Sequence, residues 1–270
     1  MRRILFYALA LPLFFACSVH HYKSEEGGTH TLEKSEATQA VLFMQTSAEY
    51  RALCYQTFNF GRLRLDDYLR RMGMNLSRQY AIVVDIDETV LDNSPHAAQS
   101  ILDGTSYPVG WKEWVDKREA RPIPGALEFL NYAHQKGVAL FYISNRKEAT
   151  REATMANLRE MGFPNVKEET LLLRTTTSGK EPRRKVVAQK YEILMFFGDN
   201  LADFTTLFEH KSISERFEIV DKYAADFGSR FFVLPNPTYG DWEGAIYDYD
   251  YAKSPQEKAQ LRRAALKGFH

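Results

Sequence analysis

The chain has 270 residues, of which 44% are hydrophobic and 13% aromatic, and this is enough to bury a large core in one domain. Its 35 Lys and Arg side chains balance its 35 Asp and Glu side chains, so no overall charge attracts nucleic acid or an anionic membrane surface. Composition therefore argues against an intrinsically disordered chain and against a nucleic acid polymer as partner.

The N-terminal segment 1–16 combines two arginines with an apolar run that is too short to span a bilayer as a mature helix. This composition is typical of an export signal peptide. In the following "FFACS", Ala16 precedes Cys17 as in a bacterial lipobox, although Phe14 stands where leucine is usual. We therefore expect an exported protein that a lipid on Cys17 anchors to a membrane. Ordinary secretion or an uncleaved anchor are the alternatives.

Residues 17–37 are polar and contain a glycine pair, so they are expected to form a flexible tether. Once Cys17 is lipidated, Cys54 is the one cysteine left in the sequence. An intramolecular disulfide or a cysteine-rich zinc site is therefore excluded, and Cys54 is interpreted as a small buried apolar residue.

The apolar pattern of the remaining chain predicts helices and strands in alternation. From 38 to 72 the spacing is helical, which predicts one or two packed helices. Four short apolar segments predict buried strands, at 81–84, 137–144, 191–197 and 230–235. Helical patterns lie between them, at 124–136, 147–161, 183–190, 201–209 and 213–227. This order predicts an α/β fold, with a parallel sheet that has helices on both faces.

The first predicted strand ends in Asp85 and Asp87, inside "VDIDETVLDNS". Ligands of parallel sheets bind beyond the carboxyl ends of the strands, so both carboxylates are expected in one crevice. Two unpaired carboxylates would repel each other and lose hydration. A divalent cation that prefers oxygen ligands, such as Mg²⁺, would compensate for this cost. The alternative is an acidic turn exposed to solvent.

Three more polar clusters follow in order along the chain. "ISNRK" contains Ser144 and Asn145 directly after the second strand, where a hydroxyl and backbone amides could hold a phosphate oxygen. "SGKEPRRK" offers Lys180, and "FFGDNLADF" places Asp199 and Asp203 after the third strand. Taken singly, these clusters are explained as helix caps or solvated charges. Together, and in this order, they indicate a site for metal-assisted phosphate chemistry.

These motifs are similar to those of the haloacid dehalogenase (HAD) superfamily. More closely, residues 41–250 resemble the class C acid phosphatases, the family of outer-membrane lipoprotein acid phosphatases and 5′-nucleotidases. The matching segments include "VDIDETVLDNSP", "ISNRK", "SGKEPRR", "GDNLADF" and "LPNPTYGDWEG". The resemblance implies a Rossmann-like phosphatase domain at 38–250, a small and largely helical cap from 38–80 and 93–123, and a helical tail at 251–270. It also suggests a homodimer and location at the bacterial outer membrane or its periplasmic face.

The resemblance implies a role for each motif. Asp85 would be the nucleophile that forms an aspartyl-phosphate, and Asp87 would act first as general acid and then as general base. Asp85, the backbone carbonyl of Asp87 and Asp199 would hold Mg²⁺. Ser144 and Lys180 would bind the oxygens of the transferring phosphoryl group.

Further residues would support this chemistry. Asp203 would orient Lys180 or the waters of the metal, with Thr89 and Asn93 as supporting groups. Lys185 is a second lysine in the same segment, and "SGK" with the arginine three residues later favours Lys180.

Aromatic residues would determine which substrates bind. Trp111 and Tyr239 match positions where the family stacks a nucleobase, and Asn145 is a further expected substrate contact. Trp114 and Trp242 are interpreted as packing residues, and core packing is the alternative for Trp111 as well.

The expected protein is thus a Mg²⁺-dependent phosphomonoesterase acting on small phosphate esters, 5′-mononucleotides and nicotinamide mononucleotide among them. A surface lipoprotein that binds a nucleotide or haem without turnover is the alternative. A nucleophile that faces a general acid has no use in a pure binding protein, which argues for the enzyme.

Overall fold

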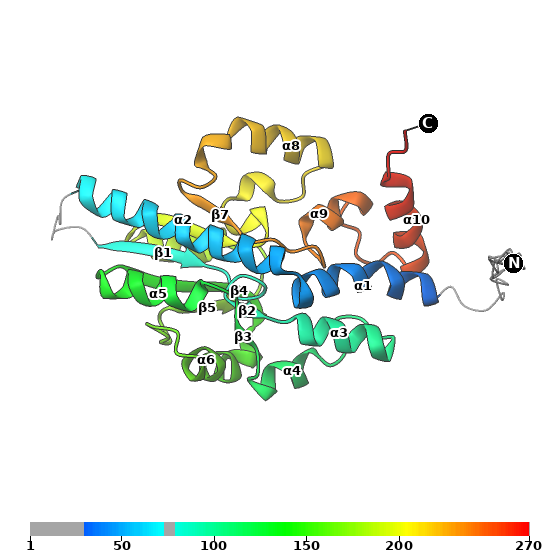
Figure 1. The fold of residues 1–270 in the computed structure, drawn as a ribbon, viewed down its shortest axis with the longest axis horizontal. Helices are drawn as coiled ribbons and strands as arrows, with labels where there is room; N and C mark the ends of the chain where they lie inside the picture. Colours follow the sequence, from blue (N-terminus) through cyan, green and yellow to red (C-terminus); the bar gives the residue numbers. More distant parts are fainter. Residues whose placement is uncertain (1–29, 73–78, 270) are drawn as a thin grey trace, which may run out of the picture.

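The computed structural model describes residues 30–72 and 79–269, so the predicted signal peptide and Cys17 lie outside the described residues. Its centre is a five-stranded parallel sheet in the order β5-β4-β1-β6-β7 (Figure 1). The strands are β1 (Tyr80–Val84), β4 (Ala139–Lys147), β5 (Leu171–Arg174), β6 (Glu192–Gly198) and β7 (Phe231–Val233). A short antiparallel pair joins β2 (Leu91–Asp92) to β3 (Arg121–Pro122). The predicted α/β class is confirmed.

Helices connect and cover these strands. They are α1 (His30–Thr46), α2 (Ala48–Met72), α3 (Ser94–Asp103), α4 (Trp111–Lys117), α5 (Ala126–Gln135), α6 (Arg151–Glu160), α7 (Glu181–Ala188), α8 (Ile213–Lys222), α9 (Asp241–Gly244) and α10 (Pro255–Ala265). In the described part of the chain, no helix is both long enough and apolar enough to cross a bilayer.

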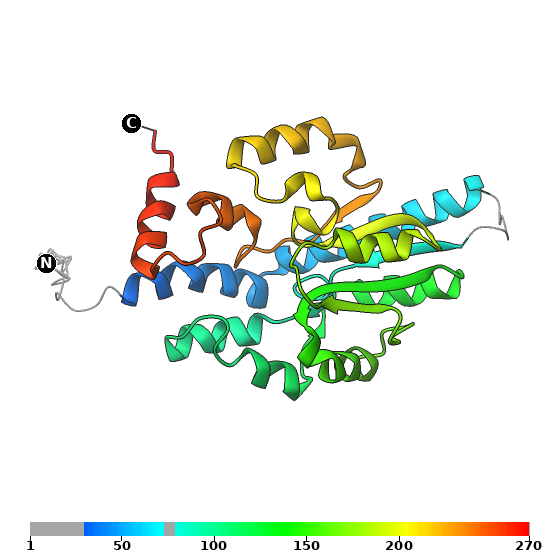
Figure 2. The same ribbon diagram turned by 180° about the vertical axis from the view of Figure 1, so that it is seen from behind.

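Successive side chains of β1 point to opposite faces of the sheet, and each face has its own core. Ile82 and Val84 belong to the larger cluster, which includes side chains of α2, α5 and α6. Ala81 and Val83 belong to the second cluster, which includes Val187 of α7. Figure 1 and Figure 2 show these helix layers on the two sides of the sheet. The prediction of helices on both faces is therefore confirmed.

The long helix α2 lies against the sheet, which corrects the assignment of residues 48–72 to the cap. The ring of Phe58 stacks on Phe197 of β6, with ring centres 5.3 Å apart. A Cβ on Gly61 would lie 2.5 Å from the Phe197 ring, so the absent side chain lets the helix approach the sheet closely. Helical spacing reveals that a face is apolar, but it does not reveal which element covers that face.

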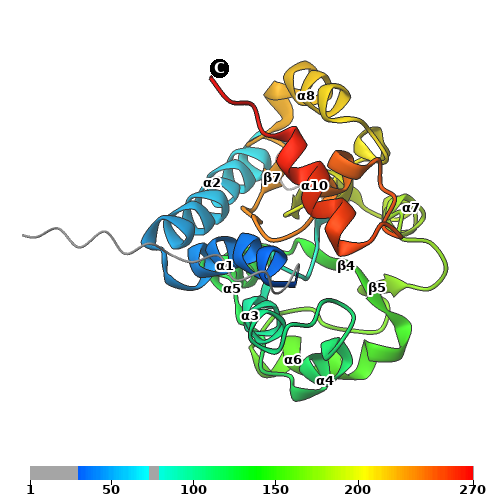
Figure 3. The ribbon, with the colours of Figure 1, turned by 90° about the vertical axis from the view of Figure 1, so that its right-hand side faces the viewer.

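The other N-terminal and C-terminal helices gather at one end of the molecule. In Figure 3 the helices α1, α3, α4 and α10 are seen at this end, which is the end toward which the strands point in Figure 1. Helix α1 packs against α3 and α10. Because α1 begins at His30, residues 30–37 are helical, although the sequence analysis placed them in the tether. Their Leu, Glu, Lys and Ala residues are good helix formers.

Two other local predictions were wrong. The edge strand β5 (Leu171–Arg174) was missed, because an apolar run of three residues is too short to be recognised by its pattern. The helix predicted at 201–209 is replaced by two 3₁₀ turns, at 201–203 and 206–208. Cys54 is fully buried and free, as its interpretation required.

Candidate active site

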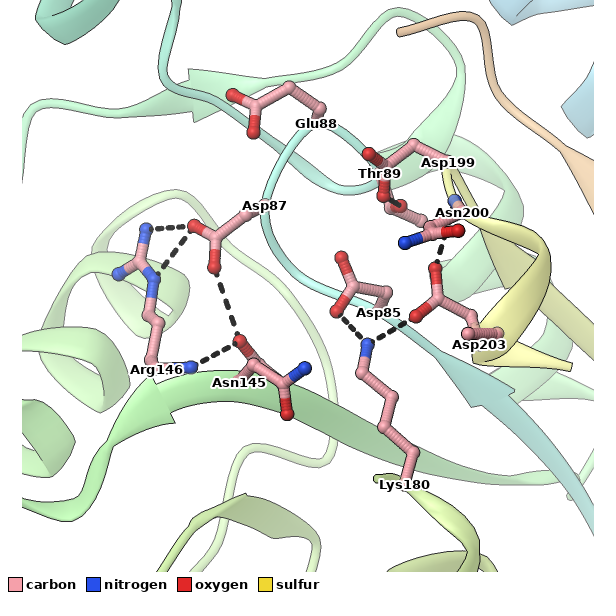
Figure 4. A network of polar contacts seen from close by, with 12 residues as sticks. Asp85, Asp87, Glu88, Thr89, Asn145, Arg146, Lys180, Asp199, Asn200 and Asp203 are labelled. Carbon is pink, nitrogen blue, oxygen red and sulfur yellow. Dashed lines mark hydrogen bonds and ion pairs between the residues drawn. The ribbon is translucent and has the colours of Figure 1, made fainter. Parts of the chain in front are cut away.

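The predicted site residues of three neighbouring strands meet at the carboxyl edge of the sheet (Figure 4). Asp85 follows β1, Ser144 lies near the end of β4, and Asp199 follows β6. Lys180 lies directly before α7 and reaches the same place. The chain order of the motifs, combined with parallel pairing of the strands, is the reason why they converge.

A buried lysine bridges two buried carboxylates at the centre of the site. The Lys180 ammonium contacts Oδ1 of Asp85 and lies 2.6 Å from Oδ1 of Asp203. Burial alone would lower the pKa of Lys180, but the charges of Asp203 and Asp85 outweigh burial and raise it above the ordinary value. The ammonium therefore stays charged. Lys185 lies on the surface, 3.9 Å from Glu181, and does not take part in this bridge.

Asp85 is rigidly placed. Its backbone N–H donates to the Phe197 carbonyl of β6 at 2.9 Å, and its side chain is 7% exposed. Burial, with the charges of Asp203 and Asp87, outweighs the attraction of Lys180 and raises the pKa of Asp85 to about 7. The carboxylate thus has little solvent around it, which suits a nucleophile.

The Asp87 carboxylate is turned away from Lys180 and toward β4 (Figure 4). Its Oδ1 accepts from Nε of Arg146 and from Nδ2 of Asn93, both at 2.9 Å. Its Oδ2 accepts from the Ser144 hydroxyl at 3.2 Å. Sequence reasoning missed Arg146, which is buried and also lies 3.3 Å from Asn93 Oδ1. The sequence feature that could have identified Arg146 is its position inside "ISNRK", directly after the expected phosphate-binding residues.

Asp199 is held by two side-chain donors. Thr89 Oγ1 donates to its Oδ1 at 3.2 Å, and Asn236 Nδ2 donates to its Oδ2 at 2.7 Å. Thr89 was predicted as a supporting residue, whereas Asn236, in the segment after β7, was missed. Burial and the charges of Asp203 and Asp85 raise the pKa of Asp199 well above its ordinary value, against the Asn236 hydrogen bond.

Three carboxylates form a candidate site for a divalent cation. One oxygen from each of Asp85, Asp199 and Asp203 lies within 4.8 Å of the others. Lys180 supplies a single positive charge to this buried group, which leaves excess negative charge. Hard divalent cations prefer such a set of carboxylate oxygens, so the residues present fit the metal that the sequence predicted. Asp203 belongs to this set of carboxylates, although the sequence analysis expected it only to orient Lys180 or the waters of the metal. Coordination of the metal by the backbone carbonyl of Asp87 stays a prediction.

Gly198 makes room for Asp203. A Cβ at this position would lie 2.4 Å from Oδ2 of Asp203, so a larger residue would displace the carboxylate. The same Oδ2 accepts from the backbone N–H of Asn200 at 3.1 Å. The glycine before Asp199 is therefore required by close approach of the Asp203 side chain.

Arg183 connects the end of β4 to the Lys180 loop. Its guanidinium donates to the Ser144 carbonyl at 2.6 Å, to Asn145 Oδ1 at 2.7 Å and to the Gly179 carbonyl at 3.2 Å. Asn145, expected as a substrate contact, thus uses its carbonyl oxygen within the protein. Arg183 was missed as a residue that orders the site.

Trp111 and Tyr239, the two residues predicted to stack on a nucleobase, are each connected to the loop after β1. Trp111 lies against Arg146, which binds Asp87, and Tyr239 binds Glu88. The Trp111 ring centre lies 5.4 Å from the Arg146 guanidinium carbon, and its ring meets His96 edge to face at 5.2 Å. Tyr239 is 46% exposed, and its hydroxyl donates to the Glu88 carboxylate. Stacking of a base between Trp111 and Tyr239 stays a prediction.

Glu88 is a buried acid that the sequence did not single out. It has a φ of 58° and accepts the Asn93 N–H at 3.0 Å through Oε1. Burial and the charges of Asp87 and Asp199 raise its pKa well above the ordinary value. Its contacts hold the turn that carries Asp87.

The other two tryptophans differ from each other. Trp114 packs against the larger core and donates to Asn93 Oδ1 at 2.8 Å, in agreement with a packing role. Trp242 is 44% exposed and donates to the Tyr239 carbonyl at 3.2 Å. Packing is therefore not its main contact, and it supports the backbone of Tyr239 instead.

Comparison with known proteins agrees with this geometry. Two structures of the class C acid phosphatase from Bacillus anthracis, one of them with tungstate bound, are 46% identical to this chain and have TM-scores of 0.84 and 0.85. The match covers 88% of this chain and 99% of that one. The stem 28 kDa glycoprotein of Glycine max and acid phosphatase 1 of Solanum lycopersicum are 28% and 24% identical over 186 residues.

The chain spans 64% of the length of each of these two curated relatives. The model of the acid phosphatases of HAD subfamily IIIB matches residues 3–242. Because this match includes most of the chain, the chain belongs to the acid phosphatase family of HAD subfamily IIIB.

Proposed function

We propose that this protein is a Mg²⁺-dependent acid phosphatase that hydrolyses small phosphate monoesters, with 5′-mononucleotides and nicotinamide mononucleotide among its substrates. The observation that carries the proposal is the bridge of Lys180 between Asp85 and Asp203, with Asp199 beside it. A nucleophile, a cation for phosphoryl oxygens and carboxylates for a metal thus lie together. The similar Bacillus anthracis structure was solved with tungstate, a tetrahedral oxyanion like phosphate.

Asp85 performs the first step. An oxygen of its carboxylate attacks phosphorus in line with the ester oxygen, so an Asp85–phosphorus linkage forms while the bond to the leaving group breaks. Lys180 neutralises oxygens of the transferring group, because its ammonium lies against Asp85 and stays charged. Water then attacks phosphorus and releases phosphate, which restores the carboxylate.

Asp87 transfers the protons in both steps. It donates one to the departing alkoxide and later removes one from the attacking water. The environment distinguishes its two oxygens: among the residues that the structure describes, Oδ1 accepts from Arg146 and Asn93, whereas Oδ2 accepts only from the Ser144 hydroxyl. Oδ2 is therefore the oxygen that carries the proton.

Asp85, Asp199 and Asp203 would hold the metal ion, with Thr89 and Asn236 fixing Asp199. When bound, Mg²⁺ would offset the negative charge of the three carboxylates and of the phosphoryl group. Asp203 has a second role, because its Oδ1 forms an ion pair with the Lys180 ammonium and so positions it.

For localisation, we propose export and anchoring to the bacterial outer membrane by a lipid on Cys17. The supporting observations are the signal-like segment 1–16 and the lipobox-like "FFACS". A homodimer is the proposed oligomeric state, and size-exclusion chromatography with light scattering would test it.

The rival function is a lipoprotein that binds a nucleotide or haem without turnover. The enzyme is tested by assaying p-nitrophenyl phosphate and adenosine 5′-monophosphate before chelation, after chelation, and after Mg²⁺ is added back. We expect hydrolysis of both esters, loss with chelator and recovery with Mg²⁺. Nucleotide binding by calorimetry without phosphate release would support the rival.

A further inference from the structure

The segment between β7 and α9 carries Asn236, whose side-chain amide is hydrogen-bonded at both ends. Its Nδ2 donates to Asp199 Oδ2 at 2.7 Å. Its Oδ1 accepts from the backbone N–H and the hydroxyl of Thr238, at 2.9 and 2.6 Å, and from the Tyr239 N–H at 3.4 Å. One amide therefore joins a carboxylate of the candidate metal site to the backbone of a residue that is expected to stack on the nucleobase.

The two ends of this amide cannot be exchanged. A carboxylate offers only acceptors, and a backbone N–H is only a donor. In the reverse orientation, the amide oxygen would face Asp199, and the NH₂ group would face the N–H groups of Thr238 and Tyr239. The donor end therefore belongs to the metal site, and the acceptor end belongs to the turn that carries Tyr239.

The backbone around Asn236 is stiff and is attached next to Asp199. The Leu234 N–H donates at 2.9 Å to the carbonyl of Gly198, the residue that precedes Asp199. Asn236 then stands between two prolines. Each proline ring fixes its own φ, and the second proline also restricts Asn236 to extended backbone angles. The backbone therefore holds the amide in a defined place beside Asp199.

Tyr239 has a second attachment, at the far end of its side chain. The residue is 46% exposed, so packing alone does not fix its ring. Its hydroxyl donates to Oε2 of Glu88, and Oε1 of Glu88 accepts the Asn93 N–H at 3.0 Å. Asn93 Nδ2 in turn donates to Asp87 Oδ1 at 2.9 Å. Tyr239 is thus held from the metal side of the site through Asn236, and from the turn of the proposed general acid through Glu88.

We propose that Asn236 is a positioning residue that sets the distance from the metal site to Tyr239, and thereby the preference for nucleoside monophosphates over small esters. A nucleotide must place its phosphate at the carboxylates and its base on Tyr239 at the same time, whereas a small ester makes only the first contact. The energy of stacking is available only if both contacts fit one ligand, so it depends on this distance. The inference rests on the proposed function.

Two substitutions separate the two ends of the Asn236 side chain. Asn236→Ala removes both ends. Asn236→Asp keeps an acceptor for the turn of Tyr239 but replaces the donor with a second carboxylate beside Asp199. Asn131→Ala is the matched control, because the Asn131 amide also donates to two carbonyls, and both lie outside the candidate site.

The metal end is measured without substrate, as the rise in melting temperature when Mg²⁺ is added at about pH 8. Asn236→Ala leaves Asp199 without this donor, so half of the full rise should require about tenfold more Mg²⁺. Asn236→Asp adds a negative charge beside Asp199. Its metal-free form should therefore melt at a lower temperature, and Mg²⁺ should raise that temperature by more than in the wild type. Asn131→Ala should respond to Mg²⁺ as the wild type does.

The substrate end is measured by calorimetry with Mg²⁺ in an Asp85→Asn background, in which the ligand is not consumed. Inorganic phosphate reaches only the metal site, whereas adenosine 5′-monophosphate also reaches Tyr239. The ratio of the phosphate to the nucleotide dissociation constant therefore measures the contribution of the base. Asn236→Ala should reduce this ratio about three- to tenfold, because the turn loses its acceptor. Asn236→Asp and Asn131→Ala should keep the ratio.

Thr238→Val is a milder test that leaves Asn236 in place. It removes one donor to Asn236 Oδ1 and should reduce the same ratio about two- to fivefold, with an unchanged response to Mg²⁺. This variant keeps the test decisive if Asn236→Ala fails to give a cooperative melt.

Three results would overturn the inference: a ratio that neither Asn236→Ala nor Thr238→Val changes, a ratio that Asn236→Asp reduces as much as Asn236→Ala does, or equal dissociation constants for the two ligands when Asn236 is intact. Failure of the proposed function is a different result. It appears as absence of hydrolysis by the protein with Asp85 intact, whereas both binding measurements are made without turnover.

Discussion

Arg146 holds Asp87 through the edge of its guanidinium while an aromatic ring lies near the same group: Nε lies 2.9 Å from Asp87 Oδ1, and the Trp111 ring centre lies 5.4 Å from the guanidinium carbon. Nη2 makes a second contact of 2.9 Å to the same oxygen. The position of the proposed general acid is thus set by a buried arginine from β4. The arginine in turn lies against the aromatic ring proposed to bind the base.

The first prediction concerns Arg146. Arg146→Lys and Arg146→Gln should lower kcat about ten- to a hundredfold with little change in KM, because neither side chain can replace the planar fork that positions Asp87. Alkyl phosphates should lose more than p-nitrophenyl phosphate, whose leaving group needs less help from an acid. Arg118→Gln, which breaks the exposed pair with Glu160, is the control and should be neutral. Equal losses on both esters would show that Arg146 serves only the fold.

The second prediction concerns the nucleophile. Asp85→Asn should reduce turnover by at least about three orders of magnitude, because an amide cannot attack phosphorus. The amide keeps an oxygen for a metal, so Mg²⁺ should still raise the melting temperature. Asp87→Asn should also lose turnover, since it cannot carry the proton. Substantial hydrolysis by the Asp85 variant would contradict the covalent mechanism and indicate attack by a water molecule.

The third prediction is a pH dependence of metal stabilisation. Burial raises the pKa of Asp85 from 3.8 to about 7 and raises that of Asp199 as well. Such groups bind protons more tightly when folded, so their contribution to stability is complete below their unfolded pKa and is lost as pH rises through the folded one. The metal-free protein should thus lose this stabilisation progressively from about pH 4 upward, and it should be less stable at about pH 8 than at about pH 5.

Because Mg²⁺ replaces the missing positive charge, it should raise the melting temperature more at the higher pH. Differential scanning fluorimetry with and without Mg²⁺, at about pH 5 and at about pH 8, measures this difference in melting temperature. Asp199→Asn removes one of the carboxyls and should reduce the difference. A Mg²⁺ effect that is equal at the two pH values would refute the assignment of the cation to these three carboxyls.

The fourth prediction concerns substrate choice. Trp111→Ala or Tyr239→Ala should weaken recognition of adenosine 5′-monophosphate and nicotinamide mononucleotide by about 1–3 kcal/mol, since a stacked base loses its platform. A small aryl phosphate should keep most of its kcat/KM. Tyr239→Phe removes the bond to Glu88 but keeps the ring, and therefore separates stacking from positioning. Parallel losses on both substrates with a lowered melting temperature would mean that the rings only pack.

The fifth prediction concerns the anchor. Cys17→Ala should release the protein from the membrane fraction with unchanged specific activity, because Cys17 precedes the described catalytic domain. Fractionation with an activity assay and mass spectrometry of the N-terminal peptide measure both effects. An alanine variant that stays membrane-bound, or a wild-type peptide without lipid mass, would exclude the lipobox.

Sequence reasoning found the groups that stand directly after predicted strands, because strand order fixes where they converge. Asp85 and Asp199 were found in this way, whereas Lys180 was found from its place in the "SGK" motif. The side chains that hold these groups were harder to predict, because they are distant in the sequence. Asn236 is 37 residues from Asp199, and Arg146 is 59 residues from Asp87. The direction of a side chain such as Asp87 depends on those partners, so it could not be predicted from the local motif. The edge strand β5 was too short to give a pattern.

Phe197 joins the nucleophile to the interior of the protein. Its carbonyl accepts the Asp85 N–H, while its ring is stacked between Phe58 of α2 and Phe232 of β7, at 5.3 and 4.6 Å. A displacement of the Phe197 backbone would therefore act on both the Asp85 N–H and these rings. The nucleophile is therefore attached to the packed interior of the domain, and local opening of surface loops should leave its attack geometry unchanged.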